Sequence, residues 1–372
     1  MDRRRYLATF GAAAALGGCA GRPDAGGGRI ESDDTTTADG VATDTLATGL
    51  EIPWGAASRD GTLYLTERPG RIVRLVDGSV EPVVESVDGV RHAGEGGLLG
   101  LAFHPSKPYA YTHQTYETEG GLANRLVRHD LTDGWAAEPL LTGIPGARTH
   151  DGGRLLAHGG ALYMTCGDAS APPNAQNPDV RAGSVLRVTL DGEPHPDNPF
   201  DSPVYSYGHR NPQGLAVRDG RLYSTEHGPS VADEINVLRA GENYGWPDAR
   251  GPSDDDRFTD PLAHYSPTIA PASAAFYDGP IEAWQGDFFF GTLKAEHVRR
   301  VRFEGSATRR ASDASSGGDA VVEQERLFEG AYGRIRTVFT GPDGHLHAVT
   351  SNRDGRGSPV GADDRLLRFT PT

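Results

Sequence analysis

Short apolar segments separated by glycine-rich turns run along most of this chain and predict a protein built from β-strands. One hairpin shows the pattern most clearly: residues 155–156 form a strand, residues 158–160 a turn, and residues 161–168 the returning strand. Two antiparallel strands joined by a tight turn bring the outer ends of the hairpin together. We therefore expect His150, just before the first strand, to lie beside Asp168, at the end of the second.

The same hairpin occurs six times: a glycine turn, a strand, a loop, and a strand rich in Val, Ile, Leu and Arg. The copies pair residues 61–66 with 71–75, 109–112 with 125–128, 160–165 with 184–188, 220–225 with 234–238, 287–292 with 298–301, and 344–350 with 365–369. The period of roughly 50 to 65 residues is near that of a propeller blade with long loops. Because one blade cannot bury both faces of its sheet, we predict an all-β, six-bladed β-propeller; a two-sheet β-sandwich is the alternative.

The register of the copies places polar candidates together. His150, Arg210 and Arg334 each stand ten residues before the turn glycine of their own copy. In a propeller, these positions surround one mouth of the central channel. The loops after the second strands open on the same face and contain the remaining candidates: Glu67, Asp168, Gly228, Pro229, Lys294 and Asn352. Positive charge gathered at one mouth predicts an anionic ligand.

The overall charge narrows the range of partners. The formal net charge is −15, and Lys107 and Lys294 are the only lysines, the other basic residues being Arg. An acidic surface argues against a nucleic-acid partner. It is typical of a protein kept soluble in high salt, and we expect a halophilic protein; a high-GC coding sequence is the alternative explanation of Arg in place of Lys.

The first 43 residues resemble an export signal followed by a tether. Residues 3–7 resemble a twin-arginine (Tat) motif, and the apolar run 7–16 is too short to span a bilayer. Residues 16–19 resemble a lipobox, so we expect a signal peptide over 1–18, a lipidated Cys19, and a protein anchored on the outer face of the cell membrane. An ordinary cleaved signal is the alternative.

Residues 19–43 have almost no large apolar side chains and predict a flexible tether, so we place one folded domain at 44–372. The only other cysteine, Cys166, ends a strand and is expected to be a small buried residue. The mature chain can therefore form no intrachain disulfide.

Several motifs between about Ile52 and Thr370 resemble the glucose/sorbosone dehydrogenase family, whose members include soluble glucose dehydrogenase and aldose sugar dehydrogenases that use pyrroloquinoline quinone (PQQ). The motifs are Gly94–Pro105, His150–Arg154, Tyr207–Gly214, Glu226–Pro229, Asp233–Asn236, Asn243–Pro247, Leu293–Lys294 and Arg334–Arg336. The resemblance implies a quinoprotein that oxidises aldose sugars at C1 to lactones.

By this resemblance, the catalytic residues would be His150, Asp168 and Arg210. His150 would be the general base that takes the proton of the anomeric hydroxyl, and Asp168 would orient its imidazole. The residues matching cofactor-binding positions are Glu95, Arg210, Asn211, Lys294, Arg334 and Arg336. Guanidinium groups suit the three carboxylates of PQQ, and a lysine ammonium can sit against a quinone oxygen.

The resemblance also implies two calcium sites. Gly228 and Pro229 match positions whose backbone carbonyls bind the Ca²⁺ that polarises the cofactor, and carbonyl oxygen is a suitable donor for this hard cation. Glu234 and Tyr244 match a separate structural Ca²⁺ site, to which the tyrosine would contribute its carbonyl.

Two other functions fit the same propeller: a non-catalytic sugar- or ligand-binding module, and a calcium-dependent lactonase. The lactonase is less favoured because such sites place several carboxylates on the metal, whereas this mouth is mainly basic. For the dehydrogenase we expect an aldose substrate, an electron acceptor that the sequence does not identify, contact with the membrane only through the lipid anchor, and a monomer or homodimer.

Overall fold

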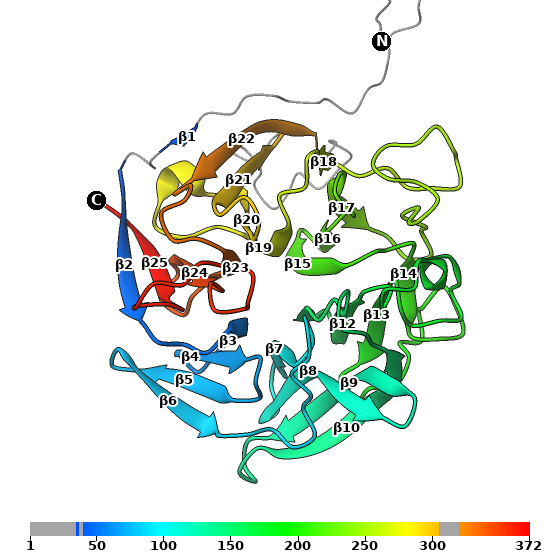
Figure 1. The fold of residues 1–372 in the computed structure, drawn as a ribbon, viewed down its shortest axis with the longest axis horizontal. Coiled ribbons are helices and arrows are strands. Elements are labelled where there is room, and N and C mark those ends of the chain that lie inside the picture. The colour runs from blue at the N-terminus through cyan, green and yellow to red at the C-terminus, as the bar shows by residue number, and fades with distance from the viewer. Residues whose placement is uncertain (1–34, 37–39, 305–319) are drawn as a thin grey trace, which may run out of the picture.

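The computed structural model describes residues 35–36, 40–304 and 320–372. Six β-sheets stand around a central channel like the blades of a propeller, as the repeat predicted (Figure 1). The expected signal peptide over 1–18 and Cys19 lie outside the described residues. No helix in the described part of the chain has the length and apolar character needed to cross a membrane.

In the first four blades the strands follow one another in sequence from the channel outward. Blade one contains β3 (Pro53–Arg59), β4 (Thr62–Glu67), β5 (Ile72–Val76) and β6 (Ser79–Val84), and blade two contains β7 (Leu98–Phe103), β8 (Tyr109–Thr118), β9 (Gly121–Asp130) and β10 (Ala136–Pro145). Blade three contains β11 (Leu155–His158), β12 (Ala161–Cys166), β13 (Ser184–Thr189) and β14 (Val204–Tyr207), and blade four contains β15 (Pro212–Arg218), β16 (Arg221–Glu226), β17 (Asp233–Leu238) and β18 (Ala263–Tyr265). The innermost strands of neighbouring blades contact one another, as β3 does β7 and β15 does β19.

The last two blades each recruit a strand from the N-terminal part. Blade five contains β19 (Pro271–Phe276), β20 (Phe288–Thr292), β21 (Val298–Phe303), β22 (Val321–Leu327) and the short β1 (Thr35–Thr36). Blade six contains β23 (Ile335–Thr340), β24 (Leu346–Thr350), β25 (Leu366–Pro371) and β2 (Val41–Ala47). Two short 3₁₀ helices, η1 (Pro172–Gln176) and η2 (Glu282–Trp284), lie in the connections.

The ring closes where β2 pairs antiparallel with β25, from Val41 opposite Pro371 to Ala47 opposite Leu366. The folded unit therefore begins before residue 44, the boundary expected from composition. The expected boundary falls inside β2, which begins at Val41. It was misplaced because β2 is an outer strand with mostly half-buried positions, so it lacks the apolar run that marks the inner strands.

The core lies between the blades. Every residue of β12 is buried, because its sheet is covered by a neighbouring blade on each side. Between blades four, five and six, Phe288, Phe289 and Phe290 are fully buried. Burying a side chain of this size contributes about 1.5 to 3 kcal/mol, so stacked blades hold the inner strands and the loops between them in fixed positions. Cys166 is buried at the end of β12, as expected.

Candidate active site at the channel mouth

The β11–β12 hairpin brings His150 and Asp168 together as its register predicted. Imidazole Nδ1 lies 2.8 Å from a carboxylate oxygen of Asp168. The chain reaches this position through a left-handed backbone at His150, with φ of 65°. Gly167 is needed beneath it, since a Cβ there would lie 2.0 Å from the His150 carbonyl oxygen. The loop backbone thus presents the imidazole while the strands remain paired.

Asp168 is completely buried and fully engaged in hydrogen bonds. Its Oδ2 accepts the indole N–H of Trp246 at 2.9 Å, and its Oδ1 accepts the backbone N–H of Ser170 at 2.7 Å as well as His150. A carboxylate held on both oxygens fixes the ring, and it selects the tautomer with the proton on Nδ1. Nε2 of His150, which makes no hydrogen bond to any described residue, is left as the atom that can accept a proton.

Glu95 ties the loop of His150 to two other blades. Its Oε2 accepts the backbone N–H of His150 at 3.0 Å and the side-chain amide of Asn211 at 3.4 Å, and its Oε1 accepts Arg356 at 2.7 Å. Burial opposes ionisation of this carboxyl, but the His150 N–H and the Arg356 guanidinium outweigh it and lower the pKa of Glu95 to about 2. Asn211 is oriented in turn, because its Oδ1 accepts the backbone N–H of Gly152 at 3.1 Å.

Arg334 and Arg336 lie buried side by side at the start of β23. Arg334 donates to the Leu293 carbonyl at 2.8 Å and to Asp354 at 2.8 Å, and Arg336 donates to Gln213 at 2.6 Å and lies 3.7 Å from Asp354. Burial lowers the pKa of Arg336 to about 9. One carboxylate shared between two guanidinium groups leaves this part of the mouth positive.

Several buried polar atoms at the mouth have no hydrogen-bond partner among the residues that the structure describes. They include Arg68 Nε, Asp151 Oδ2, Arg210 Nε, His227 Nε2 and Arg336 Nε. Buried polar groups are normally paired, and each exception calls for an explanation such as a ligand or water. Three of these five atoms belong to arginine side chains, as expected of a site for an anion.

Two predicted residues lie apart from this cluster of contacts. Lys294 is exposed and its side chain makes no hydrogen bond to the described residues, but its loop lies against Arg334 through the Leu293 carbonyl. Glu67 lies at the end of β4 on the predicted face, but its carboxylate accepts hydrogen bonds from the Arg71 side chain at 2.6 Å and from the backbone N–H of Glu51. Glu67 is therefore a structural group of blade one.

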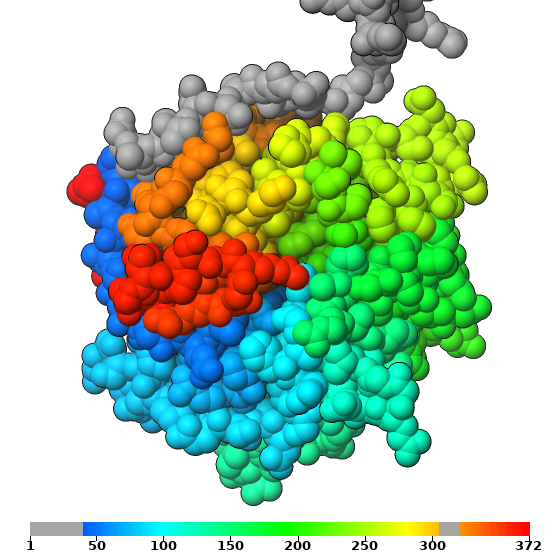
Figure 2. Space-filling view, viewed as in Figure 1, coloured from blue at the N-terminus to red at the C-terminus, as the bar shows by residue number. Residues whose placement is uncertain are grey.

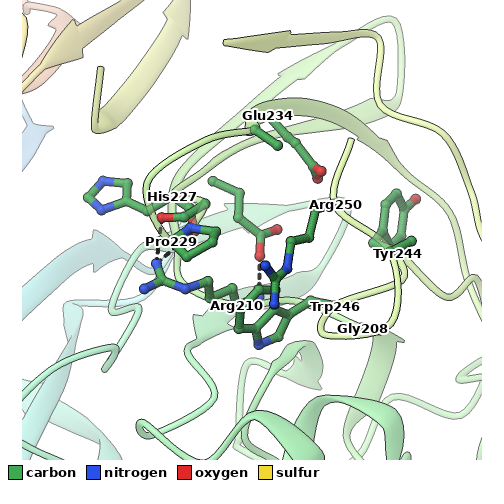
Figure 3. Close-up of a pocket in the computed structure, with 12 residues that line it drawn as sticks. Gly208, Arg210, His227, Pro229, Glu234, Tyr244, Trp246 and Arg250 are labelled. Atoms are coloured by element: carbon green, nitrogen blue, oxygen red, sulfur yellow. Dashed lines mark hydrogen bonds between the residues drawn. The ribbon is translucent and has the colours of Figure 1, made fainter. Parts of the chain in front are cut away.

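The four residues expected to hold calcium line one pocket beside β16 and β17 (Figure 3). The Gly228 carbonyl, expected to face the metal, accepts a hydrogen bond from Arg210 at 2.7 Å, and the His227 carbonyl accepts the same nitrogen at 3.1 Å. The Arg210 guanidinium also lies 5.3 Å from the ring of Trp246. A cation on the Gly228 carbonyl would therefore have to share this oxygen with Arg210 or displace it.

Glu234 and Glu226 are two carboxylates that line the same pocket. Burial, followed by the charge of Glu226, raises the pKa of Glu234 to about 8. Its oxygens accept the backbone N–H of Gly251 at 2.9 Å and the amide of Asn236 at 3.1 Å. Across the described residues, no group of three or more His, Cys, Asp or Glu side chains is arranged to hold a metal ion, so a calcium ion here would need backbone carbonyls or water to complete its ligands.

Sequence reasoning missed four residues of the site. Trp246 lies in a quoted motif, but the pattern gave no sign that its indole would reach Asp168. Gln213 follows the recognised Arg210 and Asn211 and bonds Arg336 across the channel. Asp354 and Arg356 lie in the connection between β24 and β25, where no strand periodicity marks which side chains turn inward.

Comparison with known proteins identifies the family of this chain. The Glucose / Sorbosone dehydrogenase family profile matches residues 50–367. The chain is 30% identical to aldose sugar dehydrogenase YliI of Escherichia coli over 85% of this chain and 91% of that protein. It is 36% identical to quinoprotein glucose dehydrogenase B of Acinetobacter calcoaceticus over 57% of this chain and 52% of that one.

Among solved structures, the PQQ-bound aldose sugar dehydrogenase of Streptomyces coelicolor superposes with a TM-score of 0.77 and 35% identity, covering 90% of this chain and 99% of that one. The six blades, the matched span and these relatives lead to one conclusion: this chain belongs to the glucose/sorbosone dehydrogenase family.

Proposed function

We propose that this protein oxidises aldose sugars at C1 to the corresponding lactones, with PQQ as the electron acceptor in the site and calcium as its companion ion. The observation that carries the proposal is the His150–Asp168 pair standing beside buried guanidinium groups with unused donors. A base and a set of anion-binding groups at one mouth are what this reaction requires of the protein.

The proposed chemistry divides between the ligand and the chain. PQQ, when bound, accepts the hydride that leaves C1 of the sugar. Nε2 of His150 takes the proton of the C1 hydroxyl, so that the C–O bond can become a carbonyl as the C–H bond breaks. Asp168 accepts a hydrogen bond from Nδ1–H throughout and stabilises the imidazolium that forms. A positioned base of this kind contributes roughly 10² to 10⁴ in rate.

The residues present fit a tricarboxylate quinone. Arg334, Arg336 and Arg210 offer planar guanidinium groups, and within the described part of the chain Nε of both Arg210 and Arg336 has no hydrogen-bond partner. Asn211 adds an amide next to them, and Lys294 lies on the loop beside Arg334. Charge-assisted hydrogen bonds from arginine to carboxylate are among the strong ones, so these groups would set both affinity and orientation.

Calcium fits less completely, and we propose two positions for it. The carbonyls of Gly228 and Pro229 would hold the ion near the cofactor, and the Arg210 contact to the Gly228 carbonyl would give way. Glu234, with the carbonyl of Tyr244, would hold a structural ion. The raised pKa of Glu234 beside Glu226 supports the second position, because a divalent cation relieves the cost of placing two carboxylates in one pocket.

The experiment is a titration of the purified protein with PQQ in the presence of CaCl₂, followed by the cofactor's absorbance. A panel of aldoses is then tested by reduction of a dye. We expect saturable binding and turnover with at least one aldose. An Arg334→Met/Arg336→Met double variant should lose PQQ binding. Arg218→Met should not, because Arg218 is the last residue of β15 and lies at the end of the strand away from Arg210 and Asn211. Absence of both binding and turnover would reject the proposal, and binding without turnover would favour the non-catalytic alternative.

A further inference from the structure

The connection between β24 and β25 reaches across the channel mouth to the loop of blade two. Arg356, in this connection, donates from Nη1 to Oε1 of Glu95 at 2.7 Å. Figure 2 shows the C-terminal part of the chain, in red, extending over the centre of this face toward segments coloured cyan. The contact therefore joins the last blade to the second one over the site itself.

The position of Arg356 is fixed by its own loop. Its backbone N–H donates to Oδ1 of Asp354 at 2.9 Å, and Asp354 is anchored by Arg334. Gly357, the next residue, has no room for a side chain, because a Cβ would lie 2.6 Å from the Asn352 carbonyl oxygen. The guanidinium thus starts from a constrained backbone although 55% of its side chain is exposed.

Glu95 passes the contact on to the general base. The oxygen opposite the one held by Arg356 accepts the backbone N–H of His150, and the Glu95 side chain is only 15% exposed. His150 is in a left-handed conformation that a non-glycine residue adopts at a cost, so its backbone needs external restraints. A carboxylate pinned at Oε1 cannot rotate away from the His150 N–H at Oε2.

We propose that Arg356 is a positioning residue that acts through Glu95 to hold the His150 loop in its reactive geometry. This inference rests on the proposed function for its effect on turnover, but the restraint itself belongs to the chain. Exposed ion pairs contribute little to folding stability, whereas a small displacement of a catalytic group can cost roughly 100-fold in rate. Loss of Arg356 should therefore act on chemistry far more than on folding.

The first test is Arg356→Ala in the PQQ- and calcium-loaded protein. We expect kcat to fall by roughly 10- to 100-fold, with KM for the sugar and the melting temperature nearly unchanged. Arg356→Lys should restore most of the rate, because the contact uses a single nitrogen that an ammonium can replace. Arg353→Ala removes the same charge from the same loop without a contact to Glu95, and should behave as wild type. Equal losses in the two alanine variants would overturn the inference.

A double-mutant cycle separates action through Glu95 from direct contact with ligand. Glu95→Gln has one acceptor oxygen in place of two, so it cannot accept both from Arg356 and from the donors on the other side, the His150 N–H and the Asn211 amide. It should therefore lower kcat by itself, and adding Arg356→Ala should cause no further loss. If the fold-reductions in kcat of the two single variants multiply in the double variant, Arg356 contacts sugar or cofactor directly, which contradicts a positioning role.

A readout without turnover completes the design. Hydrogen exchange of the peptide containing residues 147–153 should show faster exchange of the His150 amide in Arg356→Ala, and wild-type exchange in Arg353→Ala and Arg356→Lys. Unchanged exchange in Arg356→Ala refutes the restraint. If wild-type protein oxidises no aldose, the proposed function fails, while faster exchange in Arg356→Ala alone still supports the restraint.

Discussion

The two sides of the channel mouth differ in how their polar groups are stabilised. On the side of blade three, protein groups alone satisfy the hydrogen bonds of Asp168. Its carboxylate accepts hydrogen bonds from the imidazole of His150, the indole N–H of Trp246 and the backbone N–H of Ser170. On the side of blade four, Glu234 shares a pocket with Glu226, and burial together with that neighbouring charge raises the pKa of Glu234 to about 8.

The difference matches the roles that we propose for the two sides. A group that moves a proton must already be oriented before substrate arrives, so its partners are part of the chain. A group that binds a cation needs negative charge that no protein group neutralises. Without the cation this charge lowers the stability of the fold, and binding of the cation restores it. The first side should respond to substitutions of single side chains, and the second to the ions in solution.

The largest expected effect comes from removing the proposed base. His150→Gln keeps the volume and a polar end but cannot accept the proton, so we expect kcat to fall by about 10² to 10⁴. PQQ affinity should change little, because the imidazole Nε2 contacts no described residue, whereas the melting temperature should fall because the buried Asp168 carboxylate loses the hydrogen bond from imidazole Nδ1. Steady-state dye reduction with saturating sugar measures this. A variant that retains wild-type kcat would show that another group takes the proton.

A pH-dependent stability effect tests Asp151, whose Oδ2 has no hydrogen-bond partner among the described residues. Asp151 is almost completely buried, and burial raises the pKa of its carboxyl from 3.8 to about 6. Between these values the native state binds a proton that the unfolded state has lost, so stability falls as pH rises from about 4 to 6. The full cost above pH 6 is about 3 kcal/mol.

Asp151→Asn separates this effect from general pH dependence. Its amide oxygen can still accept the hydrogen bonds from Asn124 and from the backbone N–H of Ala147, but it carries no charge. We expect the free energy of unfolding of the variant, relative to wild type, to rise between pH 4 and pH 6 and then stay constant. Urea unfolding at pH 4, 5, 6 and 7 measures it. A difference that does not vary with pH would mean that Asp151 titrates normally.

The same contrast explains what could be predicted from the sequence. The fold and the His150–Asp168 contact follow from a hairpin that recurs six times along the chain, because strand register fixes which ends meet. Trp246, Asp354 and Arg356 were missed because they lie in connections, where the direction of a side chain depends on turns and contacts from distant blades. The Arg210 bond to the Gly228 carbonyl likewise depends on how a long side chain folds back, which register does not determine.

Calcium provides the test of the blade-four side. We expect CaCl₂ at about 100 times its dissociation constant to stabilise the protein by about 2.7 kcal/mol. Glu234→Gln should lose most of this gain and should be at least as stable as wild type without calcium, because it removes one of two neighbouring carboxylates. Thermal unfolding in EDTA and in CaCl₂ measures both effects. Equal calcium stabilisation of the two proteins would exclude Glu234 as a ligand.

The smallest effect is expected beneath the site, at Cys166. Its side chain is 1% exposed, and burial raises the pKa of the thiol well above its ordinary value, so the folded protein should resist alkylation by iodoacetamide. Cys166→Ala removes about one methyl-sized group and should cost about 1 kcal/mol of stability with kcat unchanged. A marked loss of kcat would show that the packing at the end of β12 helps to hold Asp168, and that the His150 side depends on its core as well as on its hydrogen bonds.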